Sequence, residues 1–451
     1  MTRTLAWIGA LPVLLFLAPA SGKADAAQPA RKPNIVFLLA DDLGWKDVGY
    51  HGSEIRTPHL DKLAAAGVRL NHFYVMPLCS PTRACLMTGR YPIRYGLQTG
   101  VVRPDAQYGL PLDERTLAAA LRAAGYFTAI IGKWHLGDFQ PDYLPTRRGF
   151  DHQYGLHVGM IDYYTHKRNG KVNWFRNDKL LEEEGYTTQL LAKEAVRLID
   201  RHDFTRPLFL YVPFNAPHSP LQAPADYLAQ YKDIKDAKRR SYAAMVACMD
   251  DAIGAIVAAL AKRGVMDDTI IIFSSDNGGP LNFGANNGTL RAGKNSLYEG
   301  GVRVPAFVVW RGTLMGGGIV NEPLHMVDMY PTLLKRAGAS LEQKLPLDGR
   351  DAWPTIAGGK PSPHEEILFN VEAHRGALRR GSWKLVVHGK LPGPADQLQM
   401  YKSVELFNLA DDPGEQTNLA GKHPQIVRDL LGRLNGYARA AVPAKGAAGK
   451  Q

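Results

Sequence analysis

Cysteine is scarce in this chain of 451 residues, which contains only Cys79, Cys85 and Cys248. Three cysteines cannot build a disulfide framework or an all-cysteine zinc site. No run of five or more Lys and Arg occurs, although these residues number 54 against 43 Asp and Glu and give a formal net charge of +11. The positive charge is spread along the chain. We therefore expect general attraction to anions rather than a nucleic-acid-binding tail.

The N-terminus has the pattern of an export signal. Arg3 precedes an apolar stretch at residues 5–18, and Ala24 to Ala26 have the small-x-small spacing of a cleavage site. The stretch is short for a membrane span, and no later run of 18 or more apolar residues follows. We therefore expect a signal peptide at residues 1–26. The mature protein would be periplasmic or secreted, without membrane contact, and would keep a net charge of +10 after losing Arg3, Lys23 and Asp25.

Apolar runs alternate with helical patterns over most of the chain. The runs at residues 34–40, 127–131, 207–212 and 268–274 lack polar alternation, which is typical of strands buried on both faces of a parallel sheet. Helical patterns lie at residues 57–66, 115–124 and 241–262. This order predicts an α/β fold with helices on both faces of the sheet. Residues 302–310 are predicted as an edge strand because they contain Pro305.

The pattern changes after about residue 358, where Pro361 and Pro363 indicate a boundary. Short strands are predicted at residues 367–370, 375–388 and 404–408, followed by a helix at 424–440. We therefore predict a large α/β domain at residues 27–360 and a C-terminal subdomain with a small antiparallel sheet at residues 361–451. A strand set of this size rarely folds alone, so the two parts should be inseparable.

Two acidic pairs follow two of the predicted strands. Asp41 and Asp42 follow residues 34–40, and Asp276 and Asn277 follow residues 268–274. Ligands of open α/β sheets collect at the carboxyl ends of strands, and carboxylate and amide oxygens favour Ca²⁺ or Mg²⁺ over zinc. Each pair alone is more simply explained as a helix cap or a turn. When the two pairs are considered together, a metal site explains them as well as a helix cap and a turn do.

The stretch that begins CSPTR at Cys79 has the features of a helix start. Ser80 can cap a helix, Pro81 suits its first position, and Gly89 can end it. A cysteine at this point meets the positive end of the helix dipole, and Arg83 follows one turn later, so both features favour an anion. The alternative is a buried and inert cysteine, which is the interpretation we give to Cys85 and Cys248.

The residues Cys-x-Pro-Thr-Arg, followed by Leu-Met-Thr-Gly-Arg, resemble the signature of the type I sulfatases. The resemblance spans roughly residues 33–418 and is strongest to the arylsulfatase B (N-acetylgalactosamine-4-sulfatase) branch. It implies an alkaline-phosphatase-like fold with a large, mixed, mostly parallel sheet and a small C-terminal antiparallel sheet. The stretches that carry it are FLLADDLGWKDVGYHG, RTPHLDKLA, LMTGRYPIRYGLQ, GKWHLG, LPTRRGFD, DYYTH, SSDNGG and SLYEGGVR.

The resemblance also implies a site. In this family a separate maturation enzyme oxidises the signature cysteine, here Cys79, to Cα-formylglycine. The ligands of one Ca²⁺ would be Asp41, Asp42, Asp276, Asn277 and the modified Cys79. The catalytic residues would be Cys79, Arg83, Lys133, His135, His218 and Lys294. Taken singly, the histidines and lysines of this set are more simply explained as structural or surface residues.

The family chemistry suits these residue types. A hydroxyl of the hydrated formylglycine attacks the sulfate, while Ca²⁺, Arg83, Lys133 and Lys294 stabilise the charge on its oxygens. His218, with Lys294, protonates the leaving alcohol. His135 then removes a proton from the second hydroxyl, which expels the sulfate and restores the aldehyde. The implied substrate is a sulfated small molecule or a glycan such as N-acetylgalactosamine 4-sulfate, attacked from the chain end.

Some features depart from the branch. The chain has too few cysteines for the disulfides of lysosomal relatives, which favours a bacterial periplasmic enzyme. Residues 162–178 and the turn Glu372 to Arg375 differ most, and we expect both to line the substrate pocket. The sulfated group and the roles of Glu372, His374 and Arg375 therefore stay open.

Other classes of protein remain alternatives on the sequence alone. A phosphonate or phosphate monoester hydrolase of the same superfamily would share the formylglycine, although the extra His and Asp ligands of a two-zinc site are not evident. A binder of sulfated polysaccharide would use the basic surface and an unmodified Cys79 without turnover. A cysteine protease is conceivable from Cys79 and two histidines, but no protease signature surrounds Cys79.

Overall fold

The computed structural model describes residues 1–2, 4–5, 32–393 and 399–446. The chain divides into two compact units, residues 1–31 and residues 32–451, and the second unit contains all the helices and strands of the described residues. The expected signal peptide at residues 1–26 lies outside the described residues apart from positions 1, 2, 4 and 5. It therefore stays a prediction.

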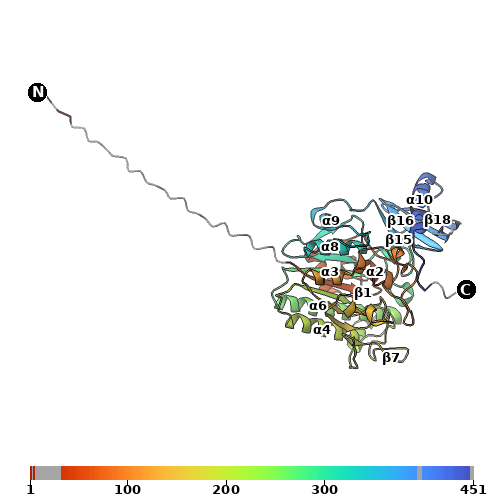
Figure 1. Cartoon of the computed structure of the whole chain (residues 1–451), viewed down its shortest axis with the longest axis horizontal. Helices are drawn as coiled ribbons and strands as arrows, with labels where there is room; N and C mark the ends of the chain where they lie inside the picture. Colours follow the sequence, from red (N-terminus) through yellow and green to blue (C-terminus); the bar gives the residue numbers. More distant parts are fainter. Residues whose placement is uncertain (3, 6–31, 394–398, 447–451) are drawn as a thin grey trace. The chain divides into compact units, whose positions relative to one another are not determined.

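Within the described residues, ten strands form one mixed sheet with β1 near its centre (Figure 1). Five neighbouring strands from β11 to β5 are parallel, whereas β12 and β8 run in the opposite direction. The predicted α/β fold with a mostly parallel sheet is thereby confirmed. The strands, in order across the sheet, are β13 (Gly318–Val320), β2 (Val68–Leu70), β12 (Ala306–Val309), β11 (Thr269–Ser275), β1 (Asn34–Ala40), β10 (Leu208–Pro213), β4 (Phe127–Ile131), β5 (His152–Gly155), β8 (Phe175–Arg176) and β9 (Lys179–Leu180).

Helices cover both faces of this sheet, as predicted. The helices are α1 (Pro58–Ala66), α2 (Cys79–Thr88), α3 (Leu117–Ala123), α4 (Thr187–Arg201), α5 (Ala225–Gln230), α6 (Ala237–Lys262), α7 (Glu299–Val302), α8 (Met329–Arg336), α9 (Trp353–Gly358) and α10 (Pro424–Ala440). Phe37 of β1 packs in one hydrophobic cluster with residues of α2, α3 and α8. The next residue, Leu38, packs in a second cluster with residues of α1, α4 and α6. Figure 1 shows these two helix layers on opposite sides of β1.

Helix α6 is the longest of these helices. It begins at Ala237, four residues before the predicted start, because the Asp236 carboxylate caps it by accepting from Arg239 N at 2.7 Å. Within the described residues, α6 alone is long and apolar enough to cross a membrane, and 78% of its most apolar window is buried inside the protein. This burial is typical of a core helix.

The C-terminal sheet contains β15 (Glu366–Glu372), β16 (Arg375–Arg380), β17 (Trp383–Lys390) and β18 (Met400–Asn408), with antiparallel pairing throughout. The predicted strand at residues 375–388 is two strands, because the chain turns at Gly381, whose φ is 58°. Residues of this sheet and of α10 belong to the same hydrophobic cluster as Phe37. The core is therefore continuous across residue 360, and a domain boundary there stays a prediction.

The strand predicted at residues 302–310 is present as the shorter β12, but its predicted position at the edge of the sheet is wrong. Residue 302 ends α7, and β12 begins only at Ala306, between β11 and β2 inside the sheet. Pro305 precedes the strand, so its missing N–H interrupts no ladder. Two short pairs complete the strands of the described residues: β3 (Phe73–Tyr74) with β14 (Leu324–His325), and β6 (Lys167–Arg168) with β7 (Lys171–Val172).

Candidate active site

Two parallel strands end side by side and present the acidic residues. Ala40 of β1 lies opposite Ser275 of β11, so the residues that follow the two strands share one edge of the sheet. Asp42 N donates to Asp276 Oδ1 at 3.3 Å, and Asn277 Nδ2 donates to Asp42 Oδ1 at 2.7 Å. The structure thus brings Asp41, Asp42, Asp276 and Asn277 together, and all four side chains are buried.

These oxygen donors suit a hard divalent cation. Asn277 Oδ1 is buried and accepts no hydrogen bond from the described residues, which leaves an amide oxygen free for a ligand. Asp41, Asp42, Cys79 and His218 also place potential ligand atoms within 4.8 Å of one another. Carboxylate and amide oxygens are the donors that Ca²⁺ takes in proteins. The chemistry of the residues therefore fits the expected ion, and the group of closely spaced potential ligands contains His218 beside Asp41, Asp42 and Cys79.

Cys79 is the first residue of α2 and lies beside the acidic cluster. Its Sγ is 3.6 Å from Asp41 Oδ1. Burial raises the pKa of the Cys79 thiol to about 12, although Lys133 and Lys294 lie near it. At the Cys79 sulfur itself, removal from water therefore outweighs the nearby positive charges. That the start of α2 favours an anion stays a prediction. A neutral, buried thiol also argues against a cysteine protease.

The predicted cap of α2 is also wrong. The helix starts at Cys79 after Leu78, which makes no side-chain cap. Ser80 Oγ instead donates to His135 O at 2.9 Å and accepts from Val102 N at 3.0 Å. Ser80 therefore joins α2 to the segments that carry two walls of the site. Gly89 ends the helix as predicted, with a φ of 67° and its N–H bonded to Cys85 O.

Arg83 and Lys133 neutralise two of the carboxylates. Arg83 donates from Nε and Nη2 to Asp276 Oδ2 at 3.0 and 2.7 Å, and Lys133 Nζ lies 2.5 Å from Asp41 Oδ2. Burial opposes ionisation of Asp41, but Lys133 and the other cations outweigh it and hold the pKa of Asp41 well below its usual range. At Asp276, burial and the charge of Asp41 prevail and raise the pKa to about 7. The expected metal ligands and sulfate-binding cations therefore form one ionic network.

Lys294 and His218 both approach Asp42. Lys294 Nζ is 2.6 Å from Asp42 Oδ1, and His218 Nε2 is 3.7 Å from Asp42 Oδ2. Burial opposes the charge of Lys294, but Asp42 outweighs it and raises the pKa of the ammonium above its usual value. Burial lowers the pKa of His218 in spite of Asp42. A protonated lysine and a neutral histidine therefore lie side by side at the site.

His135 is held in a strained position with one ring nitrogen unpaired. Its backbone has a φ of 58°, which is uncommon for a residue with a Cβ. The ring packs against Gly159, where an added Cβ would lie 2.6 Å from Nε2. Nε2 lies 2.9 Å from Val102 O, while the buried Nδ1 has no hydrogen-bond partner among the described residues. Burial lowers the pKa of His135 well below its usual value, so the neutral ring presents an unpaired nitrogen.

A cavity of about 400 Å³ is lined by several of the predicted site residues. Four of the six predicted catalytic residues line it, namely Cys79, His135, His218 and Lys294, whereas Arg83 and Lys133 are not among its lining residues. Arg168, from the segment 162–178, also lines it, as expected for that segment. The remaining lining residues are Leu78, Val101, Val102, Arg103, Pro104, Asp105, Gly159 and Met160.

The turn Glu372 to Arg375 lines a different cavity, of about 740 Å³, with residues of α10 and of the chain beyond it. The expectation that this turn lines the substrate pocket is therefore wrong for the described residues. Arg375 nevertheless reaches the site indirectly. Its Nη1 and Nη2 donate to Asn295 O and Oδ1 at 2.5 and 2.9 Å, and Nη2 pairs with Glu372 at 2.7 Å. Arg375 thus holds the residue that follows Lys294.

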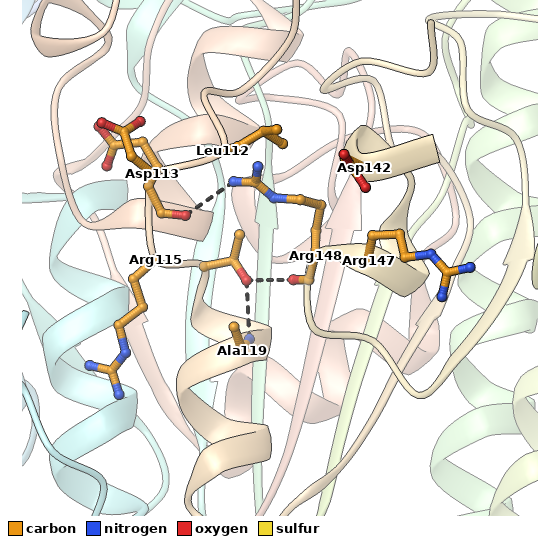
Figure 2. Close-up of a pocket in the computed structure, with 9 residues that line it drawn as sticks. Leu112, Asp113, Arg115, Ala119, Asp142, Arg147 and Arg148 are labelled. Carbon is orange, nitrogen blue, oxygen red and sulfur yellow. Dashed lines mark hydrogen bonds between the residues drawn. The ribbon is translucent and has the colours of Figure 1, made fainter. Parts of the chain in front are cut away.

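A further hollow of about 470 Å³ lies beside α3 and contains the arginines of the LPTRRGFD stretch (Figure 2). Arg148 donates to the carbonyl oxygens of Leu110, Pro111 and Glu114 at 3.3, 2.9 and 3.1 Å. Its own carbonyl accepts from the Thr116 hydroxyl at 2.5 Å, and that hydroxyl caps α3. The guanidinium is thus occupied by backbone groups. This stretch therefore stabilises the fold rather than forming a ligand site.

Comparison with known proteins gives this arrangement a family. The model of the sulfatase family matches residues 33–339. Arylsulfatase J of Mus musculus is 39% identical over 97% of this chain and 80% of its own length. This chain belongs to the sulfatase family. N-acetylgalactosamine-6-sulfatase of Homo sapiens is 35% identical over 94% of this chain and 88% of its own length. These relatives establish a sulfuric ester hydrolase without singling out the arylsulfatase B branch.

A solved structure confirms the fold of the sulfatase. The crystal structure of Ps i-CgsB superposes with a TM-score of 0.84 at 35% identity and covers 91% of this chain and 94% of its own. A second crystal structure of the same protein contains k-i-k-neocarrahexaose. The alkaline-phosphatase-like fold implied by the sequence is thereby confirmed, and the chain is a sulfatase that hydrolyses sulfate esters.

Sequence reasoning about the sulfatase missed part of the cavity wall. Arg103, Pro104 and Met160 belong to no motif and follow no predicted strand, so spacing gave no signal for them. The hydrogen bond from Arg375 to Asn295 joins residues that are 80 positions apart in the sequence. Only the packing of the C-terminal sheet against the core brings such residues together.

Proposed function

We propose that Cys79 of this sulfatase is converted to Cα-formylglycine and that Asp41, Asp42, Asp276 and Asn277 hold one Ca²⁺. The observation that carries the proposal is the position of Cys79. Its Sγ lies 3.6 Å from Asp41 Oδ1 at the floor of the cavity, beside an amide oxygen that no described residue binds. When present, formylglycine supplies the nucleophile and Ca²⁺ polarises the sulfate.

The chain's own residues bind the sulfate and move protons. Arg83, Lys133 and Lys294 place fixed positive charge near the start of α2. This charge stabilises the negative charge that develops on the sulfuryl oxygens. His218 and the protonated Lys294 lie together at the cavity and hold a proton for the departing alcohol oxygen. The unpaired Nδ1 of His135 accepts a proton on the other side of Cys79. Arg83, Lys133 and His135 are buried, and only 14% of the His218 side chain and 18% of the Lys294 side chain are exposed, so water competes little with their charges.

We further propose that the sulfatase acts from the chain end on sulfated glycans, such as those that contain N-acetylgalactosamine 4-sulfate. A cavity of about 400 Å³ suits one or two sugar residues rather than an open polymer groove. The similarity to a protein crystallised with neocarrahexaose supports a saccharide substrate. The charge of +10 expected for the mature chain would attract a polyanion, and salt would weaken that attraction.

The enzyme in this proposal is exported and meets a maturation enzyme before it acts. Both parts depend on the sequence: residues 1–26 have the pattern of a signal peptide, and the CSPTR stretch resembles the signature that such an enzyme reads. Export is tested by sequencing the N-terminus of the protein recovered from periplasm and medium. Recovery of the uncleaved chain from the cytoplasm alone would contradict it.

Mass spectrometry of a tryptic digest tests the modification. The peptide of residues 70–83 contains Cys79, and the peptide of residues 84–90 contains Cys85 as an internal control. We expect the first peptide to be lighter than its unmodified mass and resistant to alkylation, whereas the second alkylates fully. Cys79→Ala should lose almost all sulfate release. An alkylated Cys79 in fully active enzyme would refute the proposal.

Three substrates test the preference for chain ends. We expect release of sulfate from a sulfated disaccharide, slower release from its long polymer, and measurable release from an aryl sulfate. Rapid desulfation at internal positions of the polymer would exclude action from the chain end. Activity on the aryl sulfate alone would exclude a glycan substrate and leave the sulfatase assignment intact.

A further inference from the structure

Two arginines in the upper wall of the active-site cavity have no acidic partner. Arg103 lies in the segment after Val102, and Arg168 lies on strand β6. Among the described residues, no carboxylate lies within 4 Å of either guanidinium, although Asp105 lines the same cavity. The floor differs, because Arg83, Lys133 and Lys294 are each paired with a carboxylate. The positive charge that lines this cavity without a carboxylate partner therefore comes from Arg103 and Arg168, outside the ionic network of Arg83, Lys133 and Lys294.

Arg168 also presents a buried donor that the protein does not use. Its Nε is buried and has no hydrogen-bond partner among the described residues. An unpaired buried N–H costs free energy, so such a donor indicates a ligand that accepts from it. Arg148 shows the contrast within the same chain, because its guanidinium is bonded to three backbone carbonyls.

The hairpin that carries Arg168 is fixed to the segment of His218. The Asp162 carboxylate accepts from Tyr164 N at 3.0 Å and from Gln222 Nε2 at 2.7 Å. The hydroxyl of Tyr163 donates to His218 O at 2.8 Å. The base of the hairpin is therefore bonded to the same segment that holds the catalytic histidine. Arg168 thus keeps a defined position relative to the reacting group.

We propose that Arg168, assisted by Arg103, binds a second anionic group of the substrate. The sulfate ester that the enzyme cleaves then belongs to a saccharide that carries a further sulfate or a carboxylate beside it. A guanidinium suits either group because its fork of donors matches two oxygens. This inference rests on the proposed function, and it defines the substrate class as a doubly anionic saccharide.

Binding and turnover of three probes test the inference. The probes are N-acetylgalactosamine 4-sulfate, N-acetylgalactosamine 4,6-disulfate, and a disaccharide of N-acetylgalactosamine 4-sulfate with a uronic acid. We measure kcat/KM by sulfate release and, on the Cys79→Ala protein, Kd by calorimetry. In Arg168→Gln the preference for a doubly anionic probe over the monosulfate should fall about ten- to a hundred-fold, the range of one charge-assisted contact. The probe that shows the fall identifies the second group as sulfate or carboxylate.

Two further variants sharpen the result. Lys167→Gln removes a charge from the same hairpin, but neighbouring residues of a strand point to opposite faces. This variant should therefore keep the wild-type preference for a doubly anionic probe over the monosulfate. Arg168→Lys keeps the charge without the fork and should recover part of the preference. An unchanged preference in Arg168→Gln would overturn the inference, and so would an equal loss for all three probes. Absence of sulfate release from every ester would refute the proposed function, while the Kd values would still decide the role of Arg168.

Discussion

Lys384 joins the C-terminal sheet to the core, and its replacement by methionine tests that connection. Its Nζ lies 2.9 Å from Glu299 Oε1 and 2.9 Å from Glu415 Oε1, and all three side chains are fully buried. Glu299 belongs to α7, whereas Lys384 belongs to β17 of the C-terminal sheet. Lys384→Met keeps most of the buried apolar volume and leaves two carboxylates without their shared cation.

The expected loss of stability follows from the burial. Removing one member of a buried ion pair costs about 3–5 kcal/mol. The entropy of unfolding is about 2.1 cal/mol/K per residue, or roughly 0.9 kcal/mol/K for residues 32–451. The ratio predicts a fall in Tm of about 3–6 °C. Differential scanning calorimetry measures it, with Lys402→Met as the control because Lys402 is exposed on β18 of the same sheet.

The effect of Lys384→Met on stability should depend on pH in one direction. Burial raises the pKa of Glu415 from 4.5 to about 7, while Lys384 opposes the rise. Between these values the folded protein holds more protons than the unfolded chain, so lowering the pH through this window stabilises the fold. Without Lys384 the pKa of Glu415 rises further. Lowering the pH therefore increases the free energy of unfolding of the variant by more than that of the wild type. The difference in Tm should therefore be larger at pH 8 than at pH 5.5. An equal difference at both values, or one no larger than in Lys402→Met, would refute this reasoning.

Three further outcomes are expected. His218→Ala and Lys294→Ala should lose much more rate on sugar sulfates than on aryl sulfates with good leaving groups, and equal losses in paired kinetic assays would reassign both to sulfate binding. Exhaustive chelation should abolish activity and lower Tm, with recovery by Ca²⁺, whereas stoichiometric zinc in elemental analysis would contradict the oxygen-donor site. Arg375→Ala should lower kcat/KM about ten- to a hundred-fold by releasing Asn295, and an effect no larger than that of surface Arg380→Ala would contradict this.

The parts of the fold that depend on local patterns were predicted well. The strands at residues 34–40 and 127–131 and the helix at 424–440 have the predicted bounds, because their apolar periodicity is strong and turn residues flank them. The prediction of an edge strand at residues 302–310 failed because it placed Pro305 inside the strand, whereas Pro305 lies just before β12. The α2 cap failed because Ser80 forms a tertiary contact with His135 O, which no local pattern shows.

The candidate site was predictable for the residues that follow strands or belong to motifs. Asp41 and Asp276 follow adjacent parallel strands, so the sheet itself brings them together. The protonation of the site was not predictable in the same way. The helix start and the nearby Arg83 favour an anion beside Cys79, whereas the pKa of the thiol itself is raised by burial, which depends on the whole packed structure. Arg168 was found only as part of a divergent segment, since its place in the cavity wall depends on residues distant in sequence.

Two contacts from the small C-terminal sheet converge on the segment that carries Lys294. Arg375 of β16 binds Asn295, and Lys384 of β17 binds Glu299. The sheet therefore holds this segment at Asn295 and at Glu299, in addition to completing a shared hydrophobic core. It follows that a chain ending at residue 360 should lose cooperative unfolding and sulfate release together, and that residues 361–451 alone should not fold. Circular dichroism melts of both fragments, alone and mixed, measure this. A cooperatively folding fragment 361–451, or full turnover by the shortened enzyme, would show that the sheet is an independent domain.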